Sequence, residues 1–254
     1  MKFIRICHYQ ITSPLINPKH DSIRIMHLTD LHLKRRINLD TIIESTLEKY
    51  NPSFVALTGD YVCYDGKSLP KVTKLLNKIK IPKYATLGNH DHWYSAIEVT
   101  NALEAGGCTV LRNKNVETEI NGEKLSIIGI DDKVTKNHDP IKACENVVGK
   151  TRIVLSHVGD VIDEIKNNAL ILSGHTHAGQ ISIPVITKKL LKYYGLKYVY
   201  GFYQIGDQMM YISSGIGESV PIRFRARCEI CIFDLKNGKT PAYSLLEQKL
   251  RIIP

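Results

Sequence analysis

The sequence predicts one α/β domain that combines parallel and antiparallel strands. Short apolar runs alternate with helical patterns through the first half of the chain, which is typical of a parallel sheet. In the second half, Asn121-Gly122 separates two strand-like runs and signals a two-residue hairpin, so we also expect antiparallel strands. No linker rich in Pro, Gly or Ser and no repeat divides the 254 residues. We therefore expect a single domain over residues 1–254.

The first half of the chain reads as strand, helix, strand, helix and strand. Residues 23–28 form an apolar run of strand length, and residues 38–50 place apolar side chains at helical spacing. Asn51-Pro52 ends that helix. The same two patterns then predict, in order, a strand over 54–57, a helix over 71–80 and a strand over 84–87.

The second half contains mainly strands. Residues 116–120 and 124–130 flank the hairpin signal and form its two arms. Further short apolar runs predict strands over 152–155, 169–172, 209–212 and 229–235. Cys228 and Cys231 have C-x-x-C spacing, but a zinc site of that type needs a second pair, so we interpret both as core residues of the last strand.

The composition is that of an ordinary globular protein. Apolar residues make up 43% and charged residues 23%, close to average values, which excludes disordered, collagen-like and coiled-coil proteins. The chain contains no run of 18 uncharged apolar residues, so the sequence offers no transmembrane helix. The net charge of +9 favours partners that carry phosphate, which include nucleic acid, anionic lipid and phosphorylated substrates.

The six cysteines and the N-terminal residues indicate a cytoplasmic protein. The cysteines are scattered over a long chain, whereas disulfide scaffolds are short and rich in cysteine, so we expect reduced thiols. Residues 1–13 interrupt their apolar side chains with Arg5, His8 and Gln10, and a signal peptide needs a continuous apolar segment. We expect no export by that route.

In five places a predicted strand runs straight into side chains that bind metals. Open α/β sheets place their ligand sites at the carboxyl ends of strands. Carboxylate, imidazole and amide groups together suit Mn, Fe or Zn better than an ion that prefers thiolates. The five segments are Asp30-Leu31-His32, Gly59-Asp60, Gly88-Asn89-His90-Asp91, Ser156-His157 and Gly174-His175-Thr176-His177.

Two of these segments hold candidate ligands two residues apart. In an extended chain, residues i and i+2 point to the same side. We therefore expect Asp30 to act with His32, and His175 with His177, as two-ligand claws. Five of the ten histidines fall in the five segments, which unrelated hydrogen-bonded caps do not explain.

In this order, the five segments resemble the motif set of the calcineurin-like metallophosphoesterases: D-x-H, G-D, G-N-H-D/E, an isolated His and G-H-x-H. The match covers residues 23–177. The resemblance implies a four-layer α/β/β/α sandwich of mixed sheets and two divalent transition-metal ions. We expect Mn, with Fe and Zn as alternatives. It further implies that Asp60 bridges the two ions, that the first is also held by Asp30, His32 and His177, and the second by Asn89, His157 and His175.

The same resemblance implies hydrolysis without a covalent nucleophile. Two cations about 3.5–4 Å apart convert a bridging water to hydroxide and polarise the phosphoryl oxygens. His90 stands beside the ligand Asn89 and is expected to protonate the leaving oxygen or to stabilise the phosphoryl charge. Asp91 is expected to hold the His90 imidazole.

One segment indicates a branch of the family. Residues 174–180, Gly-His-Thr-His-Ala-Gly-Gln, are similar to the branch of YkuE-type phosphoesterases and UDP-2,3-diacylglucosamine pyrophosphatases. That branch usually has Gly where Ala178 stands and an acidic residue where Cys63 stands. The resemblance implies cleavage of the pyrophosphate of UDP-2,3-diacylglucosamine in lipid A biosynthesis.

Two basic segments bear on the substrate and on location. Residues 188–203 interleave lysines with tyrosines, which suits the anionic inner face of a membrane, single-stranded nucleic acid or an ordinary solvated loop. Arg223, Arg225 and Arg227 alternate and would share one face of an extended strand, where they form either a pyrophosphate clamp or a charged surface. We expect Arg223 and Arg225 to bind the substrate and the protein to contact the membrane peripherally.

Other functions of the same fold compete with the lipid pyrophosphatase. A non-catalytic scaffold would have degraded ligands, whereas every ligand position is filled here. A nuclease of this fold normally carries additional domains, so we do not expect nucleic acid to be the partner. A soluble phosphodiesterase of unknown substrate is the main alternative. Nothing in the sequence predicts an obligate protein partner.

Overall fold

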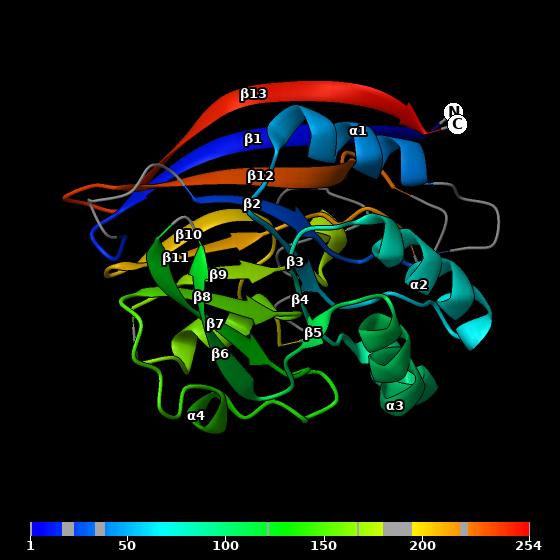
Figure 1. Cartoon of the computed structure of the whole chain (residues 1–254), viewed down its shortest axis with the longest axis horizontal. Coiled ribbons are helices and arrows are strands. Elements are labelled where there is room, and N and C mark those ends of the chain that lie inside the picture. The colour runs from blue at the N-terminus through cyan, green and yellow to red at the C-terminus, as the bar shows by residue number, and fades with distance from the viewer. Residues whose placement is uncertain are drawn as a thin grey trace.

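Two mixed β-sheets lie face to face in the computed structural model of the chain (Figure 1). The structure describes residues 2–16, 23–33, 39–120, 122–166, 168–179, 195–218 and 223–253. Apolar side chains from both sheets, Phe54, Leu155 and Phe233 among them, form one buried cluster between the two layers. This arrangement confirms the predicted α/β class with mixed sheets.

The seven-stranded sheet has a late strand in its interior. Strand β12 pairs in parallel with β1 and antiparallel with β2, while β2, β3, β4 and β5 run parallel to one another. In sheet order the strands are β13 (Ala242–Ile253), β1 (Lys2–Ser13), β12 (Cys228–Asn237), β2 (Ile23–Leu28), β3 (Phe54–Thr58), β4 (Lys83–Thr86) and β5 (Thr109–Val110).

The six-stranded sheet contains the predicted hairpin. Strands β6 and β7 pair antiparallel with Ile120 opposite Glu123, and β7, β8, β9 and β11 run parallel. In sheet order the strands are β10 (Gly201–Ile205), β11 (Gln208–Ile212), β9 (Leu170–Ser173), β8 (Thr151–Ser156), β7 (Glu123–Ile130) and β6 (Lys114–Ile120).

Helices cover the outer faces of both sheets and complete four layers. Helices α1 (Asp40–Tyr50), α2 (Leu69–Lys78) and α3 (Asn89–Ala105) pack on the seven-stranded sheet. On the six-stranded sheet, α4 (Pro140–Ala143) and the 3-10 turn Gly159–Asp163 bury apolar side chains, together with loop residues such as Ile165 and Tyr198. The two remaining 3-10 turns, Gly66–Ser68 and His177–Gly179, lie beside the strand ends. No described helix is both long enough and apolar enough to cross a membrane.

The helical and strand patterns predicted α1, α2 and nine of the described strands to within a few residues, but not β1. Its polar residues interrupt the apolar pattern and yet pair inside the fold. Arg5 donates to Glu229 on β12 at 2.8 Å, and His8 lies 3.0 Å from the carboxylate of Asp234. The other elements that the patterns did not predict are β5, β10, β13, α3 and α4.

The basic and aromatic stretch 188–203 is described only from residue 195 onward. In that part the tyrosines pack into the protein: Tyr198 is buried and its hydroxyl donates to Asp163, while the Tyr200 hydroxyl donates to Glu229. Residues 188–194 lie outside the described residues, so the expected membrane contact stays a prediction.

The carboxyl ends of parallel strands from both sheets meet at one edge. Backbone bonds join the loops that follow them: the N–H groups of Ile216 and Gly217, after β11, donate to the carbonyls of Thr29 and Asp30, after β2, at 3.1 and 2.6 Å. Every segment that the sequence analysis singled out for metal binding follows a strand at this edge.

Candidate metal centre

The chain turns sharply at the candidate ligands. Asp30, His32 and Asp60 have left-handed backbone conformations, with φ of 50°, 37° and 58°. His175 and His177 do as well, with φ of 70° and 49°. Residues with a Cβ rarely adopt such angles, and those that do gather at functional sites.

Two glycines let carboxylates approach the backbone. A Cβ on Gly88 would lie 2.3 Å from Asp60 Oδ1, and a Cβ on Gly174 would lie 2.2 Å from Asp30 Oδ2. Because no real Cβ comes so close to another atom, a larger residue at either position would displace the carboxylate. The glycines of the G-N-H and G-H-x-H segments therefore make room for aspartates from other strands.

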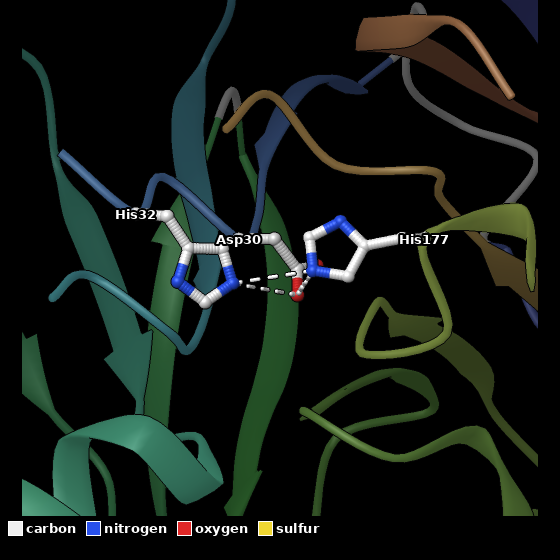
Figure 2. A group of neighbouring side chains, drawn as sticks. All are labelled: Asp30, His32 and His177. Atoms are coloured by element: carbon white, nitrogen blue, oxygen red, sulfur yellow. Dashed lines mark hydrogen bonds and ion pairs between the residues drawn. The ribbon is translucent and has the colours of Figure 1, made fainter. Parts of the chain in front are cut away.

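Asp30, His32 and His177 meet at one point although they come from distant parts of the chain (Figure 2). His177 Nε2 lies 3.2 Å from His32 Nε2 and 3.4 Å from Asp30 Oδ1. His32 Nε2 lies 3.9 Å from the same Asp30 oxygen. All three residues are buried. We refer to them as the first group.

Asn89, His157 and His175 form a second group. His157 Nε2 lies 3.2 Å from both Asn89 Oδ1 and His175 Nδ1. The other ring nitrogen of His157, Nδ1, bonds the carbonyl oxygen of Thr58 at 2.8 Å. This bond fixes the ring so that Nε2 faces the group.

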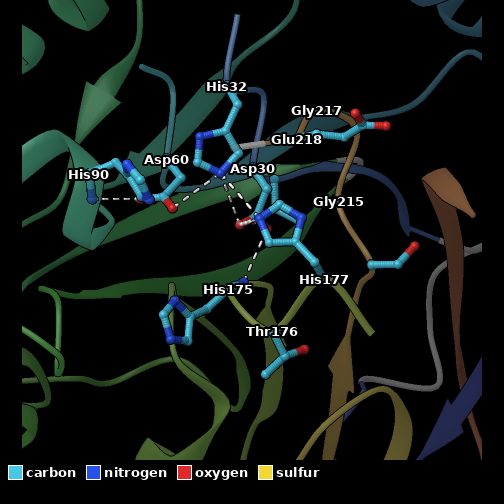
Figure 3. Close-up of polar contacts among 12 residues, drawn as sticks. Asp30, His32, Asp60, His90, His175, Thr176, His177, Gly215, Gly217 and Glu218 are labelled. Carbon is cyan, nitrogen blue, oxygen red and sulfur yellow. Dashed lines mark hydrogen bonds and ion pairs between the residues drawn. The ribbon is translucent and has the colours of Figure 1, made fainter. Parts of the chain in front are cut away.

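Asp60 contacts both groups, and Figure 3 shows it beside His32 of the first group. Its Oδ2 is 3.4 Å from His32 Nε2 in the first group and 3.3 Å from His157 Nε2 in the second. Its Oδ1 accepts a hydrogen bond from the backbone N–H of His90 at 2.9 Å. One oxygen of Asp60 is thus anchored, and the other faces both groups.

The donor atoms fit divalent metal ions. Asp30 Oδ1 is buried and has no hydrogen-bond partner among the described residues, although His177 Nε2 and His32 Nε2 lie 3.4 and 3.9 Å from it. Two atoms that bind one ion at about 2.1 Å lie about 3.0 to 3.4 Å apart, which matches most of the spacings in both groups. Nitrogen and oxygen donors together suit Mn, Fe and Zn.

The electrostatics favour the metal-binding forms of His175, His177 and Asp60. Burial lowers the pKa of His177 to about 3 and the pKa of His175 to about 4, so both imidazoles are neutral at neutral pH. Burial alone would raise the pKa of Asp60, but the neighbouring His157 and His32 hold that pKa below its ordinary value. Neutral imidazole and ionised carboxylate are the forms that bind metals. Burial would lower the pKa of His157, but the neighbouring Asp60 and Asp30 carboxylates raise that pKa well above its ordinary value, so His157 must lose a proton to bind an ion.

Only one of the two expected claws forms. Asp30 and His32 share the first group, but His175 Nδ1 faces His157 in the second group while His177 Nε2 faces Asp30. The alternation rule assumes extended backbone, and all four residues have left-handed φ angles, so sequence spacing alone does not decide which side chains of either pair face one another. This division agrees with the one that the family resemblance implies.

His90 stands beside both Asp60 and the first group. Its ring packs edge-on against His32, with centroids 4.8 Å apart, and one of its ring nitrogens lies within 4.8 Å of donor atoms of His32 and Asp60. Its Nδ1 bonds the carbonyl oxygen of Cys63. The side chain is therefore oriented by backbone rather than by a carboxylate.

Asp91 does not hold the His90 imidazole, contrary to the sequence-based expectation. Its Oδ2 accepts from the backbone N–H groups of Gly88 and Asp60 at 2.9 and 2.8 Å, and its Oδ1 accepts from Tyr61 at 2.9 Å. Burial and the neighbouring Asp60 carboxylate raise the pKa of Asp91 to about 7, against the effect of these N–H donors. Asp91 fixes the turn that carries Asp60.

Arg223 and Arg225 do not share the face of an extended strand. Arg225 has a left-handed φ of 59° and is exposed, whereas the side chain of Arg223 is only 7% exposed. The Arg223 guanidinium donates to the carbonyl of Ser214 at 2.7 Å, to the carbonyl of Gly217, and to His177 Nδ1 at 2.7 Å. Arg223 thus supports a candidate metal ligand.

A basic cavity of about 510 Å³ lies next to this arginine. Arg225 and Arg227 are exposed there, and apolar side chains form part of the wall. The lining residues are Phe3, Glu218, Arg223, Arg225, Ala226, Arg227, Cys228 and Leu250.

The sequence analysis did not single out the loop after β11. Gly215 and Gly217 lie against the first group, and a Cβ on Gly215 would lie 2.6 Å from Asp30 Cβ. The available signal was the position of the loop at a strand end together with its two glycines. The contacts of Cys63 and Arg223 carried no such signal, because they depend on tertiary structure.

Comparisons with known proteins identify the family. A family model described as calcineurin-like phosphoesterase matches residues 23–201. The chain is 31% identical over 246 residues to the metallophosphoesterase YkuE of Bacillus subtilis, covering 92% of this chain and 86% of that protein. It is 26% identical over 222 residues to the phosphodiesterase YaeI of Escherichia coli, covering 84% and 82%.

Solved structures share the fold at low identity. A 5'-nucleotidase precursor from Thermus thermophilus has a TM-score of 0.54 and 12% identity, covering 84% of this chain, which spans about half the length of that protein, 55%. GAP50, described as the anchor in the inner membrane complex of Plasmodium, also has a TM-score of 0.54 and 12% identity, covering 92% of this chain and 90% of that one.

We predict that Asp91→Asn weakens metal binding about 10- to 100-fold. Both oxygens of Asp91 accept hydrogen bonds from backbone N–H groups, and in the variant the amide NH₂ would face one of these donors. The substitution should also lower the free energy of unfolding by about 1–3 kcal/mol. Isothermal titration with Mn²⁺ and urea denaturation measure both effects. Asp139→Asn, which changes an exposed helix cap, is the control. Unchanged Mn²⁺ affinity in Asp91→Asn would contradict this role.

Proposed function

This chain belongs to the calcineurin-like phosphoesterase family, and we propose that it hydrolyses phosphoester or pyrophosphate bonds with two divalent ions held by the two groups. The first ion would be held by Asp30, His32, Asp60 and His177, and the second by Asp60, Asn89, His157 and His175. Bound there, the ions would supply Lewis acidity toward water and the phosphoryl oxygens. As a family member, the chain is a metal-dependent phosphoesterase.

The position of Asp60 carries the proposal of two ions. A single oxygen, Oδ2, lies 3.4 Å from His32 in one group and 3.3 Å from His157 in the other. Because His32 and His157 belong to different groups, this one carboxylate oxygen lies beside donor atoms of both. The hydrogen bond that Oδ1 accepts from the His90 backbone keeps Oδ2 directed between the groups.

His90 is proposed to protonate the leaving oxygen. When the Nδ1 proton is donated to the Cys63 carbonyl, the other ring nitrogen can carry a second proton and give it up. The ring is largely buried beside Asp60. A substrate phosphoryl bound between the first and second groups would therefore bring its leaving oxygen near the imidazole.

The proposed substrate is the pyrophosphate of UDP-2,3-diacylglucosamine. The similarity of residues 174–180 to that branch of the family and the net charge of +9 support it. Arg225, exposed in the basic cavity, is proposed to bind the second phosphate. The proposal includes a single domain over residues 1–254, a cytoplasmic location and peripheral contact with the inner face of the membrane.

A phosphodiesterase of another substrate is the second candidate. The relative YaeI, which is named a phosphodiesterase, favours it. A screen of the Mn-loaded protein separates the candidates, with UDP-2,3-diacylglucosamine in anionic vesicles, a dialkyl phosphodiester, a phosphomonoester and single-stranded DNA as substrates. Release of the uridine nucleotide supports the first candidate. Cleavage of the diester alone supports the second, and cleavage of none contradicts both.

We predict that Asp60→Ala abolishes metal binding in both groups, whereas Asp30→Ala empties the first group and spares the second, because only Asp60 faces both. Elemental analysis after equilibration with Mn²⁺ and gel filtration gives the stoichiometry. The wild type should hold two ions per chain, Asp30→Ala one, and Asp60→Ala fewer than one. A wild-type stoichiometry of one at saturation would rule out the two-ion proposal.

We predict that His90→Ala retains both ions and loses roughly 10²- to 10⁴-fold in kcat on a substrate with an alkoxide leaving group. The loss should be much smaller on an activated aryl ester, because that leaving group needs little protonation. Metal content and kcat on the two substrates check this. If the mutant loses an ion, His90 is a ligand and not the proton donor.

A further inference from the structure

Two large aromatic side chains flank His90 and remain exposed. Tyr64 is 68% exposed and Trp93 is 59% exposed. Their ring centroids lie 5.0 and 4.9 Å from that of His90, and both rings meet the imidazole at 62°. Exposed aromatic rings that gather around one point of a surface are typical of binding sites.

The backbone beneath both rings is fixed. Tyr64 follows Cys63, whose carbonyl bonds His90, and the preceding loop residue Val62 bonds His32 Nδ1 through its carbonyl at 3.0 Å. Trp93 lies three residues after His90, in the first turns of α3, before the non-helical Ser95. Tyr64 therefore lies in the loop that bonds His90, and Trp93 lies on the helix that carries His90. Both contacts fix where the two rings lie relative to the imidazole.

The proposed function determines what these rings would meet. If His90 protonates the leaving oxygen, the group attached to that oxygen lies on the side of the imidazole where Tyr64 and Trp93 stand. Aromatic rings contribute binding energy through their faces, and a planar π system uses that surface better than a flexible aliphatic chain does.

We propose that Tyr64 and Trp93 form a platform that binds the base of a nucleoside carried by the substrate. This inference rests on the proposed function, because His90 defines the side on which the nucleoside lies. The platform would make the substrate a nucleotide, and Tyr64 and Trp93 belong to neither group of candidate metal ligands. Because each ring would stack on the base, loss of either ring should weaken binding on the order of tenfold.

The test uses a matched pair of ligands that the enzyme does not hydrolyse. Uridine α,β-methylene diphosphate and methylenediphosphonate carry similar anions, but only the first carries a base. The full chain loaded with Zn²⁺ is titrated with each by calorimetry and by fluorescence. Trp93 is the single tryptophan of the sequence, so indole emission reports on the platform directly.

The nucleoside ligand should bind more tightly than methylenediphosphonate and should quench Trp93 emission to saturation, whereas methylenediphosphonate should leave the emission nearly unchanged. Tyr64→Leu and Trp93→Leu should each weaken the nucleoside ligand about tenfold and leave the affinity for methylenediphosphonate intact. Tyr243→Leu, at a tyrosine of β13 that is 56% exposed, is the control and should change neither affinity.

Equal affinities of the two ligands for the wild type would overturn the platform, and so would variants that weaken both ligands alike. The proposed function is tested apart from it, by hydrolysis of a dialkyl phosphodiester that carries no ring. Hydrolysis of that diester without discrimination between the two ligands would leave a phosphoesterase whose exposed rings do not bind a base. Discrimination without hydrolysis of any phosphoester would keep the platform and reject the proposed chemistry.

Discussion

The hydrogen bonds that Asp91 accepts from the backbone set the geometry on which the site depends. Its carboxylate joins the turn after β4, through Gly88, to the turn after β3, through Asp60 and Tyr61. A left-handed residue such as Asp60 has a cost of roughly 1–3 kcal/mol that its surroundings must offset. Asp91 supplies those surroundings, and the second oxygen of Asp60 then faces both groups.

The strain extends to most of the candidate ligands. Asp30 and His32 still form backbone hydrogen bonds with the loop after β3 despite their left-handed angles. Their N–H groups donate to the carbonyls of Gly59 and Asp60, both at 2.9 Å. These backbone bonds hold like charges and desolvated imidazoles close together before any cation is bound. The loops are therefore organised for binding, and metal ions would relieve the electrostatic cost that the fold sustains.

The sequence was sufficient to predict which strand ends carry the chemistry, because residue type and strand boundaries are local properties. It was insufficient for the contacts of Asp91 and Arg223, whose partners are backbone groups and rings brought together only by the fold. Strand β1 escaped prediction for a related reason. Its Arg5 reads as a surface residue, yet it donates to the buried carboxylate of Glu229.

The position of β12 between β1 and β2 in the seven-stranded sheet has a consequence for biosynthesis. Arg5 on β1 and its partner Glu229 on β12 are separated by 224 positions, and β2, which leads into Asp30, pairs with β12 on one side. A ribosome must therefore release nearly the whole chain before the sheet that supports Asp30 can close. Contacts this distant form slowly, so the sheet edge that carries Asp30 is completed late, although every candidate ligand lies within residues 30–177.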